Sequence, residues 1–309
     1  MNFFQKAIFF GITSLFLSLS AKADIKVVTT IKPLHSLISK VMDGVGEPSL
    51  IIEGTNNPHT FVFKPSHAQM LEEADIVFWV GEDLEAFLEK PLNSLAKNAT
   101  KVSFMELTSI EKLKFREENI FDDHEDHDGH EDKHEGHEHL HGEFDAHIWL
   151  DPANAKAMVL EVSHELSELD PDNKNQYEKN AAKVINSLDD LINEVDSSIS
   201  KDVSYVVFHD AYQYFENRFG VSSAGALTLN PDVLPGAKQI VDIQDIIQDK
   251  KIKCIFSEPQ YNPKIIETLA NDMNISTGVI DPLGAYLEKG SEMYNELILN
   301  IANSLKKCS

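Results

Sequence analysis

Histidine and carboxylate side chains alternate through one stretch of the chain, residues 122–143, which is rich in Asp and Glu. Its histidines are His124, His127, His130, His134, His137, His139 and His141. Imidazole is a ligand for zinc, copper and nickel, so the pattern predicts an auxiliary loop that binds metal weakly. The stretch holds too little apolar surface to fold alone, and we expect it to be disordered. A solvated linker without a function is the alternative.

Four polar residues outside this stretch are candidate ligands of one metal ion. They are His59, His147, His209 and Asp281. His59 lies in the loop after the expected strand 49–52. His209 and Asp281 directly follow the expected strands 203–208 and 275–280. His147 comes just before an expected helix. Ligands of open α/β sheets bind at the carboxyl ends of strands. Three imidazoles and a carboxylate suit zinc, although Asp281 precedes Pro282 and can equally begin a turn.

Other acidic and histidine residues receive different interpretations. Glu258 ends a further expected strand, where it would support a metal ligand from outside the coordination shell. His35, His67 and His164 lie within or beside helical patterns, and we expect structural roles for them.

Apolar runs and helical patterns alternate along the chain, which predicts parallel βαβ units. The expected strands are 25–30, 49–52, 75–80, 101–104, 203–208, 251–257 and 275–280. The expected helices are 33–42, 66–74, 85–97, 152–169, 173–199, 211–219, 237–249, 263–273 and 292–306. Residues 225–236 contain Asn-Pro and Pro-Gly pairs and are expected to form a loop.

The helix 173–199 is the longest of these and has no Gly or Pro. Its apolar residues follow a three-four spacing, and we interpret it as a backbone helix that joins two lobes. The predicted fold is therefore α/β, with two lobes of parallel sheet flanked by helices and a metal site between the lobes. The length of 309 residues also favours about two domains.

The first residues have the features of a secretory signal peptide. Lys6 precedes an apolar run, and Ala21-Lys22-Ala23 is a small-x-small cleavage site. We divide the chain into a signal peptide 1–23, a first lobe 24–170, a linking helix 171–201 and a second lobe 202–309. The mature protein should occupy an exported compartment, most simply a bacterial periplasm.

Net charge and cysteine content agree with that compartment. A formal charge of −24 excludes a nucleic-acid partner, which needs a basic face, and it favours the attraction of cations. Cys254 and Cys308 are the two cysteines, and an exported compartment allows them to form a disulfide that fixes the C-terminus. Two separate thiols are the alternative.

Several motifs together resemble one family. They are Asn57-Pro-His-Thr60, Lys64-Pro-Ser66, Ala74-Asp-Ile-Val-Phe-Trp-Val-Gly81, His147-Ile-Trp-Leu-Asp-Pro152, Phe208-His-Asp-Ala-Tyr212, Ser257-Glu-Pro-Gln260 and Asp281-Pro-Leu-Gly284. With the acidic His-rich stretch, they resemble the periplasmic zinc-uptake solute-binding proteins of the ZnuA type, which are receptors of metal ABC transporters. The resemblance covers essentially the whole mature chain.

The resemblance implies a ligand set and a disulfide. His59, His147 and His209 match the metal ligands of the family, and Asp281 matches a position where many relatives place a carboxylate ligand. Some zinc members use water instead, or a Glu immediately before the first His, where this chain has Pro58. The two cysteines match a disulfide of zinc members.

The resemblance also implies the function. The protein would capture zinc as a transported ligand and deliver it to an inner-membrane ABC permease and its ATPase for high-affinity import, without being an enzyme, and we expect a monomer. A receptor for manganese or another divalent metal is one alternative, although manganese-binding relatives tend to carry Glu where this chain has His209. A zinc buffer or adhesin without a permease is another. Three histidines with an open position also occur in zinc enzymes, but we find no motif for a paired general base or nucleophile.

Overall fold

The computed structural model describes residues 25–120, 142–229 and 235–308. The predicted signal peptide and the seven histidines of the acidic stretch lie outside these residues. Two parallel sheets of four strands form the framework, with orders β2-β1-β3-β4 and β6-β5-β7-β8. The strands are β1 Val27–Thr29, β2 Ser49–Leu50, β3 Ile76–Trp79, β4 Thr100–Ser103, β5 Tyr205–His209, β6 Ala226–Thr228, β7 Cys254–Ser257 and β8 Ser276–Val279. The predicted α/β fold with parallel sheets is confirmed.

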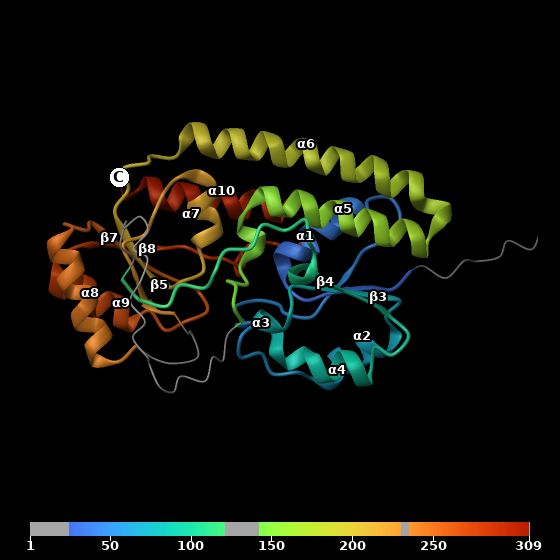
Figure 1. Ribbon diagram of the computed structural model, residues 1–309, viewed down its shortest axis with the longest axis horizontal. Helices are drawn as coiled ribbons and strands as arrows, with labels where there is room; N and C mark the ends of the chain where they lie inside the picture. Colours follow the sequence, from blue (N-terminus) through green and yellow to red (C-terminus); the bar gives the residue numbers. More distant parts are fainter. Residues whose placement is uncertain (1–24, 121–141, 230–234, 309) are drawn as a thin grey trace, which may run out of the picture.

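Helices flank both sheets (Figure 1). They are α1 Lys32–Val41, α2 Pro65–Glu73, α3 Glu82–Glu85, α4 Glu89–Ser94, α5 Pro152–Leu169, α6 Lys174–Ser198, α7 Gln213–Phe219, α8 Ala237–Asp249, α9 Lys264–Met273 and α10 Met293–Lys306. Short 3-10 turns cover Ala86–Leu88, Phe104–Glu106, Ile148–Leu150 and Pro171–Asn173. None of the helices within these described ranges is both long and apolar enough to cross a membrane.

The long helix α6 has 25 residues and spans about 37 Å. Figure 1 shows it running along one side of the molecule, above both sheets. It packs along α5 and also contacts α1 and α10. Its buried face, which includes Tyr177, Leu188 and Val195, follows the apolar spacing in the sequence. The prediction of one long helix beside two lobes is confirmed.

Two predicted elements differ from the structure. Residues 85–97 were expected to form one helix, but α3, a 3-10 turn and the short α4 replace it. Pro91 lacks an N–H, and its ring clashes with the carbonyl four residues earlier, so a helix that began at residue 85 could not continue past it; α4 begins anew and has Pro91 in its first turn. The expected loop 225–236 contains β6, which pairs with the buried strand β5.

The core extends through both lobes. Buried apolar side chains of β1, β3, α1, α5, α6, β5 and α10 form one continuous cluster. A second cluster lies in the second lobe, where α8 and α9 cover the sheet. Helix α10, which follows the second sheet in the chain, packs against α1 and α6. The lobes therefore share a core, and the exact lobe boundaries stay a prediction.

Cys254 and Cys308 form the predicted disulfide. It joins the first residue of β7 to the residue that lies just beyond the end of α10. The bond fixes the last helix to the second sheet, as the sequence predicted.

Candidate metal centre

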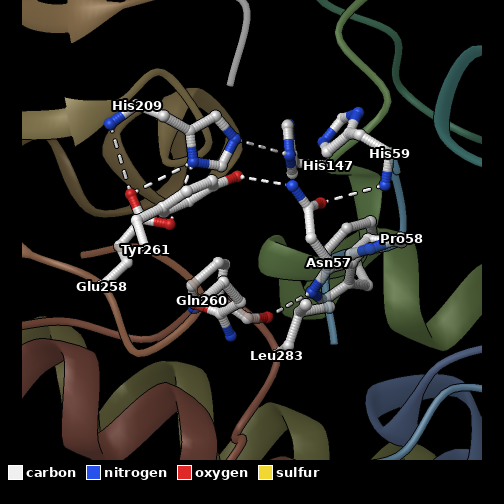
Figure 2. A pocket seen from close by; sticks show the side chains of 11 residues that line it. Asn57, Pro58, His59, His147, His209, Glu258, Gln260, Tyr261 and Leu283 are labelled. Atoms are coloured by element: carbon white, nitrogen blue, oxygen red, sulfur yellow. Dashed lines mark hydrogen bonds and ion pairs between the residues drawn. The ribbon is translucent and has the colours of Figure 1, made fainter. Parts of the chain in front are cut away.

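Three imidazoles converge between the two lobes (Figure 2). One nitrogen each of His59, His147 and His209 lies within 4.8 Å of the others. Among the residues that the structure describes, this is the group of histidines, cysteines and acids with the spacing to hold a metal ion. His147 and His209 are 5% and 3% exposed, and His59 is half-buried. Two of the three imidazoles are therefore almost inaccessible to solvent.

The three histidines come from a strand end and from two connecting segments. His59 lies in the loop between β2 and α2, and His147 directly precedes the turn Ile148–Leu150 that leads into α5. His209 is the last residue of β5. Asp151 begins α5 because its carboxylate accepts a hydrogen bond from the Ala153 N–H. The carboxyl end of β5 thus supplies one of the three histidines, as expected for an open parallel sheet, and connecting segments supply the other two.

Buried carboxylates orient two of these rings. Asp145 Oδ1 lies 2.7 Å from His147 Nδ1 and also accepts from the His147 backbone N–H at 2.9 Å. Glu258 Oε2 lies 2.9 Å from His209 Nδ1, and Glu258 Oε1 lies 3.2 Å from the His209 backbone nitrogen. A carboxylate that accepts from Nδ1–H fixes the tautomer and leaves Nε2 for a metal. The two Nε2 atoms accordingly face each other across 3.2 Å.

The electrostatics favour a divalent cation. Burial lowers the pKa of His209, but the charge and hydrogen bond of Glu258 outweigh it, and the pKa of His209 is raised overall. Asp145 and Glu258 are both buried. Carboxylates bonded to two of the three rings would stabilise a divalent cation held by those rings.

A small cavity adjoins the three rings. Its volume is about 10 Å³, which is room for about one water-sized group. Its remaining walls are largely aromatic, apolar or amide side chains: Asn57, Pro58, Trp149, Glu258, Gln260, Tyr261, Pro282 and Leu283. Three nitrogens and one further small ligand make the four-coordinate arrangement that zinc prefers.

The structure does not bring Asp281 into this group. Asp281 Oδ1 accepts hydrogen bonds from Gln260 Nε2 at 2.9 Å and from the Leu283 N–H at 3.0 Å, and Oδ2 accepts from the Ala285 N–H. Gly284 lies within this turn, and its φ of +64° favours glycine. Asp281 therefore holds a turn in this structure, which is the alternative that its position before proline suggested.

The remaining sequence assignments have clear positions. Glu258 lies where a supporting acid was expected. Asp145 was not predicted from the sequence. The feature that could have indicated it is an acid two residues before His147, a candidate ligand. His35 Nε2 bonds to the Pro48 carbonyl, and His67 Nδ1 accepts from the Lys64 N–H, as expected of structural histidines. His164 is exposed on α5.

Two α/β lobes with an imidazole cluster between them define a metal-binding receptor of the two-lobed type. The family described as zinc-uptake complex component A, periplasmic, matches residues 27–308. The chain belongs to this family.

Individual relatives support the same family assignment. The chain is 45% identical over 304 residues to the high-affinity zinc uptake system protein ZnuA of Brucella abortus, with 91% of each chain covered. It is 33% identical to the protein of the same name from Yersinia pestis, covering 93% of this chain and 92% of the relative. The fold matches that of the periplasmic zinc binding protein TroA from Treponema pallidum with a TM-score of 0.75 at 18% sequence identity. The match covers 93% of this chain and 99% of TroA.

Proposed function

We propose that this protein captures Zn²⁺ in the periplasm and delivers it to an inner-membrane ABC permease and its ATPase. The observation that carries the proposal is the group of three imidazole nitrogens within 4.8 Å of one another at the interface of the lobes. The names of the Brucella and Yersinia relatives, which describe high-affinity zinc uptake, support it.

The chemistry of the donors favours zinc over manganese. Imidazole nitrogen suits zinc, whereas manganese prefers carboxylate, carbonyl and water oxygens and six ligands. The carboxylates of Asp145 and Glu258 each bond to a ligand imidazole and lie outside the coordination shell. The cavity of about 10 Å³ admits about one further water-sized ligand rather than three.

The same geometry supports transport rather than catalysis. Asp210, the buried acid next to His209, is bonded to Arg116, and the buried acids Asp145 and Glu258 are bonded to ligand imidazoles. They are positioned to orient ligands and to balance the charge of the ion, not to abstract a proton from a substrate. The protein would hold zinc and release it unchanged.

His59, His147 and His209 are the proposed ligands. The fourth position would be filled by water, or by Asp281 if its turn opens. The histidines of residues 122–143 are proposed to collect zinc weakly. We also infer that residues 1–23 are a cleaved signal peptide and that the mature protein is a monomer.

Zinc titration by calorimetry, in competition with a chelator, tests the proposal. The samples are the mature protein, a variant that lacks residues 122–143, and His209→Ala. One tight site should survive the deletion and disappear in His209→Ala. Tight binding that disappears with residues 122–143 instead would contradict the proposed site and indicate a zinc buffer.

One further variant identifies the fourth ligand. Asp281→Asn keeps an acceptor for the turn but weakens metal coordination. If the zinc affinity stays within about threefold of the parent, the change in free energy is smaller than that of a typical hydrogen bond, and the fourth position is assigned to water. A loss of a hundredfold or more assigns it to Asp281.

A further inference from the structure

His59 differs from the other two histidines in the segment of the chain to which it belongs. His209 ends a buried strand, and His147 directly precedes the turn into α5. His59 lies in the irregular segment between β2 and α2 and is half-buried. If the three imidazoles enclose a zinc ion, one must move aside before the ion can leave, and His59 is the most exposed of the three and lies in a loop between two elements.

Asn57 connects this loop to the second lobe. Its Oδ1 accepts from the His59 backbone N–H at 2.9 Å, which fixes the loop locally. Its Nδ2 donates to the hydroxyl of Tyr261 at 3.2 Å, across 204 positions of sequence. Figure 2 shows both bonds in line, from Tyr261 through Asn57 to His59.

Tyr261 is itself fixed to the element that carries His209. Its ring stacks on Phe208 with a centroid distance of 4.6 Å and meets the His209 ring edge-on at 5.8 Å. Its backbone N–H donates to the Glu258 carbonyl. The hydroxyl of Tyr261 therefore links the His59 loop to the residues that position His209.

We propose that the Asn57–Tyr261 hydrogen bond is a clasp that controls the rate at which zinc leaves the cluster. The proposal rests on the proposed zinc site. Tyr261 is a positioning residue, because it acts on the metal through Asn57 and His59. Opening the loop requires this bond to break, whereas zinc entering an already open loop does not. Loss of the bond should therefore raise the dissociation rate and leave the association rate nearly unchanged.

The test is zinc dissociation into excess chelator, followed by stopped flow on the full mature chain at constant pH. Tyr261→Phe keeps the ring that stacks on Phe208 and removes the hydroxyl. We expect the dissociation rate to rise roughly three- to tenfold, which is the net effect of one hydrogen bond, with the association rate changed less than twofold. The kinetic phase of the cluster is the one that His209→Ala abolishes.

Tyr177→Phe is the matched control. It also removes a tyrosine hydroxyl, in this case a buried one that bonds to Asp170 Oδ2 at 3.0 Å. Asp170 caps the far end of the 18-residue helix α5, about 27 Å along the helix axis from the end that follows His147. The control should release zinc at the parent rate even if its melting temperature falls.

The outcomes separate the clasp from the site. A Tyr261→Phe protein that binds one zinc and releases it at the parent rate overturns the clasp and leaves the zinc site intact. An equal change in Tyr177→Phe also overturns it, since the effect would then follow stability alone. A parent protein with no kinetic phase sensitive to His209→Ala overturns the zinc site itself.

Discussion

The Glu258–His209 pair makes zinc binding depend on pH. A protonated His209 cannot ligate zinc, and burial opposed by the stronger effect of Glu258 raises the pKa of His209 above its usual value near 6.5. The zinc affinity should thus reach its full value above that raised pKa. It should fall as the pH drops through the pKa, and the fall should begin above pH 6.5. The zinc dissociation constant, measured by competition from pH 8 to pH 5, checks this expectation.

Glu258→Gln gives the matched comparison. Its amide oxygen still accepts from Nδ1–H, but the charge that stabilises the imidazolium is gone, so the fall should move to lower pH. Affinity at pH 8 should also drop about 10- to 100-fold, as for other changes beside a ligand. A dissociation constant that is the same at pH 8 and pH 5 in the parent would refute the argument.

At the scale of single residues, the sequence predicted which residues belong to the site better than it predicted their contacts. His209 could be assigned because an expected strand ends just before it, and His59 because it lies in the loop after one. Asp145 was missed, since its contact with His147 depends on the backbone folding back over two residues. The hydrogen bonds of Asp281 come partly from Gln260, which is 21 positions away, and local sequence does not encode such a contact.

Elements were predictable where the apolar pattern was long enough to identify the period. Helix α6 and the strand β5 were expected at nearly their observed bounds. Strand β6 was missed because three residues carry too little pattern, and its structure depends on pairing with β5. The segment 85–97 was merged into one helix because the effect of Pro91 was not weighed.

The disulfide acts at the scale of elements, since it ties the end of α10 to β7. Its cysteines are 54 positions apart, and the loop-entropy argument assigns about 4 kcal/mol of unfolding free energy to such a closure. Cys254→Ser/Cys308→Ser should therefore melt several degrees lower than the parent, while binding one zinc in the cluster. Denaturant unfolding with calorimetric zinc titration measures both effects. Equal stability with and without the bond would show that packing of α10 alone holds the C-terminus.

At the scale of the whole molecule, polar contacts reinforce the shared core. Trp149 Nε1 donates to the Pro282 carbonyl at 2.7 Å, and Tyr294 donates to the Trp149 carbonyl at 2.7 Å. The Lys32 ammonium donates to the carbonyls of Gly284, Ala285 and Leu287. Arg218 on α7 forms two hydrogen bonds with the Asp151 carboxylate at the start of α5. A wide hinge opening would break these bonds and expose the continuous apolar core to water.

Zinc loading should consequently change the overall shape little. We expect small-angle scattering of the zinc-loaded and chelator-treated protein to give radii of gyration near 19 Å that differ by less than about 1 Å. The variant that lacks residues 122–143 assigns any larger difference either to that segment or to the lobes. A difference of several ångströms that persists in the deletion variant would mean that the lobes separate. The interlobe bonds of Lys32 and Arg218 would then have to break during each cycle of loading, and release could not be limited to the loop of His59.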